Sequence, residues 1–364
     1  MRYRLLGRSG LRVSELCLGA MVFGDARGPW GATREDAEEI VSGFAEAGGN
    51  FIDTASNYAS GESERIIGEL IAPDRDRWVL ATKYTCSSRP DDPNAGGNHK
   101  KSLVRSLETS LRRLNVDYVD ILWVHIWDAL TPIEEVVRAL DDVVRAGKAL
   151  YVGISDTPAW VVSKGVTLAD LRGWSPFVAL QVPYSLVERS VERELLPMAR
   201  GLDLAVTAWS PLGDGVLSGH YGSDRPQPEE SRVARVAGHR LSERNLQIAD
   251  AVNAVARGHD ASSAQVAIAW IRAPAAPGRD HPDRRRPYTR SAQRQPRSTR
   301  DRAHGRGARP SRHRERDRAR LPTRVRRLPA RLRLNARTDR QPPTPVRSPD
   351  PARRLDTAST RNGG

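Results

Sequence analysis

Residues 118–154, YVDILWVHIWDALTPIEEVVRALDDVVRAGKALYVGI, contain one complete strand–helix–strand repeat. The run 118–124 is short and mostly apolar, which is typical of a strand buried on both faces of a parallel sheet. Residues 132–146 place apolar side chains at helical spacing, with a proline near the expected helix start and Gly147 just beyond its end. A second apolar run, 149–154, completes a β–α–β unit.

The same pattern repeats from Ser14 to Arg272. Strands are expected at 16–19, 50–53, 78–82, 118–124, 149–154, 178–182 and 204–208. Amphipathic helices are expected at 34–47, with Ile40, Val41, Phe44 and Ala45 on one side, and at 101–114, 132–146 and 262–272. Seven repeats favour an α/β fold of the (β/α)8 TIM-barrel type over an open dinucleotide-binding sheet, because no strand leads into a G-x-G-x-x-G turn. The eighth strand is missing from its expected place after residue 272.

The composition changes at that same position. From Arg272 onward the chain has 28 basic and 8 acidic residues, no lysine and a single aromatic residue, Tyr288. The preceding 271 residues hold 30 basic and 36 acidic groups, so the net charge of +14 comes entirely from the C-terminal part. We therefore expect a barrel over residues 1–272 and an Arg/Pro-rich disordered tail over 273–364, in which strand eight and the last helix are missing or replaced.

Few features point to export or to a membrane. The chain has two cysteines, Cys17 and Cys86, too few for a disulfide framework. No apolar run approaches the roughly 20 residues of a membrane helix, and the N-terminus lacks the apolar core of a signal peptide. A cytoplasmic protein without membrane partners is the expectation.

In a barrel, the active site forms where the strands end. Asp53 ends the second strand and Tyr58 follows in its loop, while Lys83 and His125 end the third and fourth strands. Taken singly, a strand-end Asp often caps a loop, and a lone Tyr, Lys or His is usually structural. Their joint occurrence on consecutive strand ends favours a catalytic site.

The combination also has a chemical logic. A phenol with a pKa of about 10 is a weak acid at neutral pH, and a nearby ammonium favours its phenolate. Asp53 keeps Lys83 charged and oriented, Tyr58 then serves as general acid, and His125 hydrogen bonds the oxygen on which charge develops. Such a site protonates a carbonyl oxygen while a hydride reaches its carbon.

Several motifs resemble aldo-keto reductases, particularly the bacterial, aryl-alcohol-dehydrogenase and potassium-channel β-subunit branch. They are the opening YRLLGRSGLRVS (3–14) with LCLG (16–19), DTA (53–55) with Tyr58 and GESE (61–64), WSPLG (209–213), and LSG (217–219). The resemblance covers Met1 to Arg272. It implies NADPH-dependent, reversible reduction of aldehydes or ketones, with Asp53, Tyr58, Lys83 and His125 as the catalytic tetrad and no metal. The alternatives are a nucleotide-binding, channel-β-like regulatory subunit and an inactive frameshifted product.

The resemblance also implies a site for NADP(H). Ser155, Asp156 and Gln181 hold the carboxamide, Tyr184 stacks on the nicotinamide, and Ser210, Leu212 and Gly213 wrap the pyrophosphate. Further cofactor positions implied are Gly19, Ala20, Met21, Trp209, Pro211, Gly219 and Arg232. Asp156 stands where the family usually has Asn, and His220 where a Lys often contacts phosphate. The substrate is a small carbonyl or alcohol compound whose identity, like any oligomeric state, the sequence leaves open.

The basic tail suggests nucleic-acid binding, which needs only positive charge. An out-of-frame translation also accounts for the missing strand and the absence of lysine. With CGN codons for arginine, residues 279–289 read one base later admit VITPIVGART, and the same reading continued through Ser291 to Thr299 admits AQLSDNLGAL. Both strings resemble the end of an aldo-keto reductase barrel. We therefore predict a one-base frame change near residues 272–278 and no specific nucleic-acid partner.

Overall fold

The computed structural model describes residues 1–24, 31–87, 89, 91–224, 233 and 237–273. These residues belong to the first of two compact units, Met1–Arg284. The predicted tail, apart from Ala273, and the predicted cofactor residue Arg232 lie outside the described residues.

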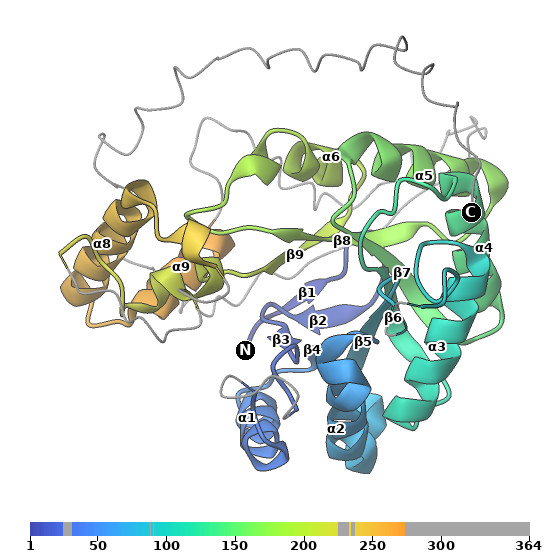
Figure 1. Cartoon of the computed structure of the whole chain (residues 1–364), viewed down its shortest axis with the longest axis horizontal. Helices are drawn as coiled ribbons and strands as arrows, with labels where there is room; N and C mark the ends of the chain where they lie inside the picture. Colours follow the sequence, from blue (N-terminus) through green and yellow to red (C-terminus); the bar gives the residue numbers. More distant parts are fainter. Residues whose placement is uncertain (25–30, 88, 90, 225–232, 234–236, 274–364) are drawn as a thin grey trace, which may run out of the picture. The chain divides into compact units, whose positions relative to one another are not determined.

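A curled sheet of seven parallel strands forms the centre of this unit, with neighbouring strands in chain order (Figure 1). The strands are β3 (Leu18–Gly19), β4 (Phe51–Asp53), β5 (Val79–Tyr84), β6 (Val119–Val124), β7 (Ala149–Ser155), β8 (Phe177–Pro183) and β9 (Ala205–Trp209). All seven predicted strands are present, shifted by at most two residues at their ends. The chain therefore has a fold of the (β/α)8-barrel class, as the alternation of apolar runs and helical stretches predicted.

The helices from α1 to α6 lie between the strands and cover the outer face of the sheet, whereas α8 and α9 follow the last strand (Figure 1). They are α1 (Arg34–Glu46), α2 (Glu62–Ile71), α3 (Lys100–Leu114), α4 (Ile133–Arg145), α5 (Ala159–Arg172), α6 (Leu195–Gly201), α8 (Glu243–Gly258) and α9 (Ser263–Arg272). Short 3-10 turns are η2 (Tyr58–Gly61), η3 (Ala72–Arg77), η4 (Ser190–Glu192), η5 (Gly213–Ser218) and η6 (Gly238–Arg240). The four predicted helices are confirmed within one residue.

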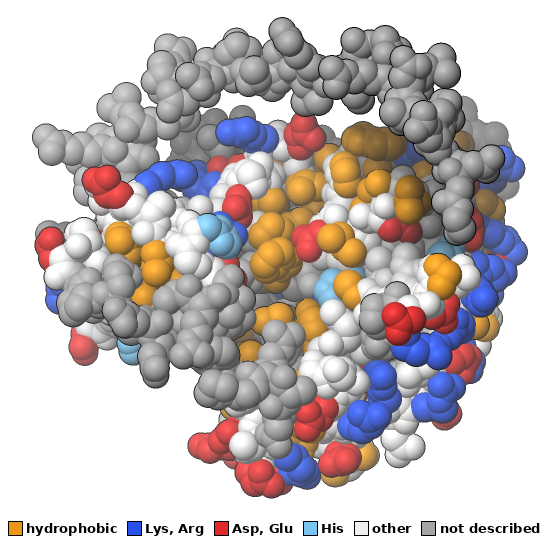
Figure 2. Space-filling model, in the orientation of Figure 1, with side chains coloured by type: hydrophobic (Ala, Val, Ile, Leu, Met, Phe, Trp, Pro, Cys, Tyr) orange, Lys and Arg blue, Asp and Glu red, His pale blue; other side chains and the backbone are white. Residues whose placement is uncertain are grey.

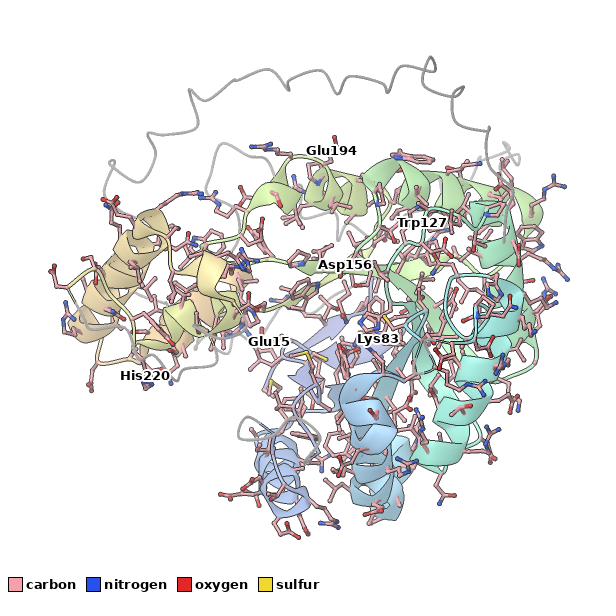
Figure 3. The ribbon with its side chains drawn as sticks, in the orientation of Figure 1. Glu15, Lys83, Trp127, Asp156, Glu194 and His220 are labelled. Atoms are coloured by element: carbon pink, nitrogen blue, oxygen red, sulfur yellow. The ribbon has the colours of Figure 1, made fainter. Side chains whose placement is uncertain are left out.

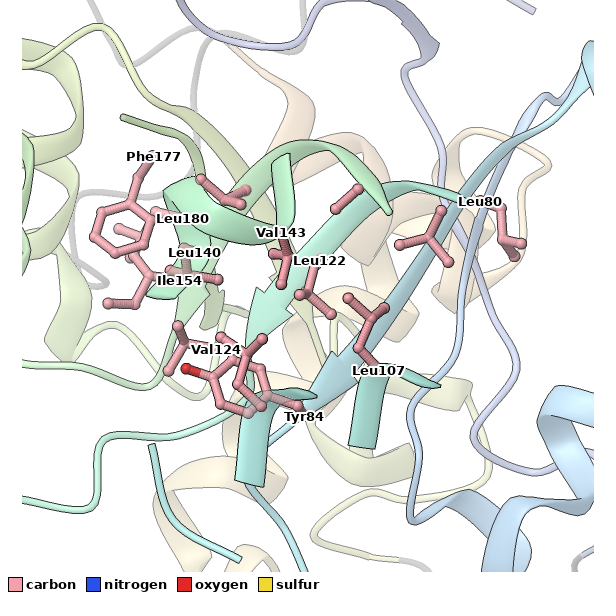
Figure 4. Packing of buried hydrophobic residues seen from close by; sticks show 14 of the residues in the cluster. Leu80, Tyr84, Leu107, Leu122, Val124, Leu140, Val143, Ile154, Phe177 and Leu180 are labelled. Atoms are coloured by element: carbon pink, nitrogen blue, oxygen red, sulfur yellow. The ribbon is translucent and has the colours of Figure 1, made fainter. Parts of the chain in front are cut away.

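Alternation along the strands divides the core into two layers. Ile52, Leu80 and Leu122 point outward and pack with the helices in the larger layer, part of which Figure 4 shows. Phe51, Val79, Ala81, Ile121 and Trp123 point into the barrel. The side chains of the central strands, such as β5 and β6, are therefore buried on both faces, which explains why these strands are mostly apolar in sequence.

An N-terminal hairpin covers this interior layer at the amino-terminal ends of the strands. Its antiparallel strands are β1 (Tyr3–Leu5) and β2 (Arg12–Ser14), and Leu6 and Val13 pack with the inward-facing strand residues. The sequence reading did not predict this hairpin. The predicted inner side of α1 was partly wrong, because Ile40 is 41% exposed while Ala37 and Val41 are buried.

The described sheet is open between its two outer strands, β3 and β9. Every residue of β5 and β6 is buried, whereas β9 contains no buried residue, and Val206 and Trp209 are 41% and 37% exposed. Beside β9, α8, α9 and η5 share a small apolar cluster of their own. In the described part of the chain, no helix is long and apolar enough to cross a membrane.

Candidate active site

The predicted tetrad continues the inward-facing series of three neighbouring strands. Asp53 follows Phe51 by two positions, Lys83 follows Ala81, and His125 follows Trp123. Since every second strand residue faces the same side, all three point to the interior at the carboxyl ends of their strands. At the carboxyl ends of the strands, the apolar interior layer thus gives way to a polar layer. Figure 3 shows the place of Lys83 in this polar layer.

Lys83 is the centre of this polar layer. Its side chain is fully buried, and its ammonium donates hydrogen bonds to Asp53 Oδ2, to the Thr54 carbonyl at 2.9 Å and to the Tyr58 hydroxyl at 3.1 Å. These three acceptors use the whole donor capacity of an ammonium group. Burial alone would lower the pKa of Lys83, but the Asp53 carboxylate and Tyr58 outweigh it and raise that pKa. Lys83 is therefore held as a cation.

The loop after β4 turns sharply to present Tyr58. Ala59, Ser60 and Gly61 all have left-handed backbones, with φ of 45°, 56° and 92°. A Cβ on Gly61 would lie 2.2 Å from the Arg113 guanidinium carbon, so this position requires glycine. Arg113 in turn donates to the Ser56 carbonyl at 2.8 Å and pairs with buried Glu64 at 3.1 Å. The loop that carries Tyr58 is thus fixed from below by α2 and α3.

His125 stands beside Tyr58, with ring centroids 5.8 Å apart and the planes nearly perpendicular. Burial, followed by the charge of Lys83, lowers the pKa of His125 to about 3, so the imidazole is neutral near pH 7. Its Nδ1 is buried without a hydrogen-bond partner among the described residues, and the same is true of Asp53 Oδ1. Two polar atoms of the cluster therefore remain unsatisfied within it.

The residues predicted to hold the carboxamide lie at the next two strand ends. Ser155 and Gln181 pair in register and are 1% and 4% exposed. Asp156 follows with a left-handed backbone, φ 41°, and its Oδ1 accepts a hydrogen bond from Trp209 Nε1 at 3.1 Å. Burial raises the pKa of Asp156 against the opposing effects of Trp209 and Lys83. Figure 3 shows Asp156 near the centre of the view.

The predicted pyrophosphate loop begins directly after β9. Its Ser210 hydroxyl accepts from the Asp214 amide at 2.9 Å, and the Gly213 amide donates to the Ser210 carbonyl at 2.9 Å. A Cβ on Gly213, where φ is 58°, would lie 2.4 Å from Val187, so a side chain there meets both strain and a clash. Leu212 and Pro211 are half-buried in this turn, and Gly219 (φ 100°) ends η5.

The remaining predicted positions are distributed around the opening. Ala20 is fully buried and its amide donates to the Asp53 carbonyl at 2.8 Å, between exposed Gly19 and half-buried Met21. The Tyr184 hydroxyl donates to Glu192 at 2.9 Å, and its ring lies 5.3 Å from that of Trp270 in α9. Figure 2 shows hydrophobic side chains gathered at the centre of this face, beside the course of β9.

Comparison with known proteins gives the chain its family. The sequence model of the aldo/keto reductase family matches residues 15–280. The chain is 40% identical over 279 residues to an aryl-alcohol dehydrogenase of Pestalotiopsis microspora, which covers 74% of this chain and 71% of that protein. It is 43% identical over 249 residues to a norsolorinic acid reductase of Emericella nidulans (65% and 64%), and 38% identical over 282 to one of Aspergillus flavus (74% and 70%). The chain belongs to the aldo/keto reductase family.

This aldo-keto reductase is accordingly an oxidoreductase of small carbonyl compounds, in a family that generally uses NAD(P)H. The structure brings the four tetrad residues together at one rim. No group of three or more potential metal ligands occurs among the residues that the structure describes.

Some residues around the site escaped the sequence reading. The Thr54 carbonyl receives a Lys83 hydrogen bond, and Thr85, Asn98 and Asp128 form a network behind His125. A backbone acceptor has no sequence signal. Asn98 and Asp128 lie in loops, and their 30-residue separation along the chain conceals their contact.

Proposed function

We propose that this aldo-keto reductase reduces aldehydes or ketones with NADPH and that Tyr58 donates the proton. The observation that carries the proposal is the buried Lys83 ammonium, which donates to both Asp53 and the Tyr58 hydroxyl. A structural lysine rarely lies fully buried at a strand end beside a tyrosine, because burial of a charge is costly unless the charge is used or paired. Here it is paired by Asp53 and directed at Tyr58.

The proton transfer follows from these contacts. A carbonyl oxygen near the Tyr58 hydroxyl receives the phenolic proton as negative charge develops on it. The phenolate that remains is stabilised by Lys83, whose own charge is balanced by Asp53. Neutral His125 donates a hydrogen bond to the same oxygen from whichever ring nitrogen carries its proton. In the direction of alcohol oxidation, the phenolate accepts the proton.

NADPH, when bound, supplies the hydride. The residues present fit such a group in part. Ser155 and Gln181 offer buried polar side chains in one register, and the turn around Gly213 excludes any side chain. Asp156 provides only acceptors, so it binds the amino end of a carboxamide and cannot donate to its oxygen. We infer a preference for NADPH over NADH from the resemblance.

For the substrate we propose an aryl aldehyde or ketone and the corresponding aryl alcohol. The support is the 40% identical relative, which carries the name aryl-alcohol dehydrogenase, together with the half-buried Trp127 and the exposed Trp209 at the rim. Aromatic side chains of this kind stack favourably on aromatic rings. A cytoplasmic location is also proposed, supported by two unpaired cysteines.

We further propose that the coding frame changes near residues 272–278. Among the described residues no strand joins β3 to β9, and β9 has no buried residue; both support this, since a barrel closes with a strand at that place. Restoring the frame is expected to supply an eighth strand and the rest of the cofactor site. The coding DNA tests it directly: if no single-base edit yields a barrel-like C-terminus, the idea is wrong.

The enzymatic proposal is tested by the oxidation of NADPH in the presence of benzaldehyde, followed at 340 nm. Both the chain as given and its frame-restored form are assayed. Tyr58→Phe is expected to reduce kcat by about 10²–10⁴-fold, the usual contribution of a general acid. The substitution keeps the ring and its contact with His125, so NADPH binding stays unchanged. Full activity of Tyr58→Phe would remove Tyr58 from the reaction.

A further inference from the structure

One buried amide side chain joins the loops that follow β5 and β6. Asn98 is fully buried, and its Nδ2 donates to Thr85 Oγ1 and to the Ile126 carbonyl, both at 2.9 Å. Its Oδ1 accepts from the Asp128 amide at 2.8 Å. Both amide hydrogens and the carbonyl oxygen are thus used, each on a different residue. A side chain so fully engaged fixes the separation of the two loops.

Asp128 completes the connection from the other side. Its Oδ2 accepts from the Asn98 amide at 2.6 Å and from Thr131 Oγ1 at 2.7 Å, and its Oδ1 from the Leu130 and Thr131 amides at 3.0 and 2.9 Å. Burial raises the pKa of Asp128, but these hydrogen bonds outweigh it and lower that pKa. The carboxylate is therefore charged at neutral pH, and its hydrogen bonds are of the stronger, charge-assisted kind.

Thr85 links this network to the candidate active site. It has a φ of 100°, a conformation that a β-branched residue adopts only under constraint, and it is 5% exposed. Its Oγ1 accepts from Asn98 and also from the backbone amide of His125, the latter at 3.3 Å. Such strain persists only where the surroundings enforce it, and it concentrates at functional sites.

The His125 side chain has little else to hold it. Its Nδ1 has no partner among the described residues, and its backbone amide donates to Thr85 Oγ1 and the Tyr84 carbonyl, both at 3.3 Å. Its ring direction therefore depends on its backbone and on the edge contact with Tyr58. The two residues that follow are exposed Ile126, whose carbonyl accepts from Asn98 Nδ2, and half-buried Trp127, whose amide donates to the Asp156 carbonyl at 3.4 Å.

We propose that Asn98 and Thr85 are positioning residues that set the place of His125 and of the Ile126–Trp127 segment that follows it. The kinetic part of this inference rests on the proposed function, in which His125 hydrogen bonds the reacting oxygen. A displacement of about 1 Å at such a position lowers rates by roughly 10²-fold. Asn98 is fully buried and Thr85 is 5% exposed, so each acts through His125.

The test uses the full chain with Thr85→Val, Thr85→Ser and Asn98→Ala. Valine keeps the shape of threonine without its oxygen, whereas serine keeps the oxygen. Asn50→Ala is the control, because Asn50 also uses both ends of its side-chain amide: its Oδ1 accepts from the Ser14 amide at 2.7 Å and its Nδ2 donates to the Arg12 carbonyl at 3.1 Å, both in β2. It lies at the opposite end of the barrel.

Two readouts are measured in every variant. For benzaldehyde reduction, Thr85→Val and Asn98→Ala are expected to lower kcat by about 10–100-fold with the NADPH Kd unchanged, while Thr85→Ser recovers most of the rate. Hydrogen exchange of the peptide spanning residues 124–128 is expected to accelerate by about tenfold or more in Asn98→Ala and not in Asn50→Ala.

Negative results in the kinetic measurement and in hydrogen exchange contradict different claims. If neither the chain as given nor its frame-restored form shows turnover, the proposed function is lost, and exchange alone decides the positioning role. Unchanged exchange over residues 124–128 in Asn98→Ala overturns the inference even in an active enzyme. The inference is also overturned if Asn50→Ala and Asn98→Ala lose the same amount of Tm and the same amount of kcat. The loss of kcat would then reflect general destabilisation.

Discussion

Substitution of Lys83 by Met should destabilise the protein strongly, and a second substitution should recover much of the loss. Methionine has nearly the length of lysine but removes the ammonium that donates to Asp53, Thr54 and Tyr58. The side chains of Lys83 and Asp53 are 0% and 11% exposed, so little solvent screens the pair. Removing one partner of a buried ion pair costs about 3–5 kcal/mol, because the other charge stays buried and unpaired.

The double variant Asp53→Asn/Lys83→Met contains neither charge. It should be more stable than Lys83→Met alone, with a coupling free energy of about 1–3 kcal/mol. Urea unfolding at pH 7 measures both, and the slope with urea must stay constant for the comparison to hold. Lys164→Met is the control. Lys164 pairs with Glu134 at the surface, where the side chains are 52% and 48% exposed, so the loss should stay below about 1 kcal/mol. A Lys83→Met protein as stable as the Lys164→Met control would refute the reasoning.

Three other substitutions test separate parts of the site. Asp156→Asn supplies an amide donor and should tighten NADPH binding several-fold, roughly the effect of one hydrogen bond, in a fluorescence titration; weaker binding would contradict the assigned contact. Gly213→Ala should lower Tm more than Gly173→Ala. The two glycines have similar φ angles (58° and 65°), but only an added Cβ at position 213 would clash, with Val187 Cγ2 at 2.4 Å. Equal losses of Tm would mean that the turn around Gly213 relaxes. His125 has a folded-state pKa of about 3, below its ordinary 6.5, so its contribution to stability is complete above pH 6.5 and is lost as the pH falls toward 3. The urea midpoint of unfolding should rise with pH between pH 4.5 and 6.5, and His125→Asn should make this rise smaller. An unchanged rise in His125→Asn would mean that other titrating groups cause it.

The sequence predicted the strands, and the proximity of Asp53, Tyr58, Lys83 and His125, because both depend on local pattern. Mostly apolar runs mark strands that are buried on both faces, and Asp53, Lys83 and His125 each fall two positions beyond an inward-facing apolar residue. The same alternation that fixes the core therefore also aims these three side chains. The position of Tyr58 depends instead on the left-handed turn of the loop after β4. The GESE motif, which begins at Gly61, indicates only part of that turn.

The features that the sequence did not predict depend on long-range contacts. The β1–β2 hairpin has two strands of three residues each, too short for a periodicity, and it is recognised by where Leu6 and Val13 pack. Ile40 has the spacing of a buried helix residue but is exposed, while Ala37 takes the buried place. The contact between Asn98 and Asp128 joins two loops that no pattern connects.

The role of the site is tested most directly by following a labelled hydrogen. NADPH carrying deuterium at the transferable position of nicotinamide C4 is incubated with benzaldehyde and the frame-restored chain, and the benzyl alcohol formed is analysed by mass spectrometry. The account predicts one deuterium at the carbinol carbon, with formation of the labelled alcohol reduced by about 10²-fold or more in Tyr58→Phe. Absence of labelled alcohol with the unsubstituted protein, or its undiminished formation with Tyr58→Phe, would contradict the account.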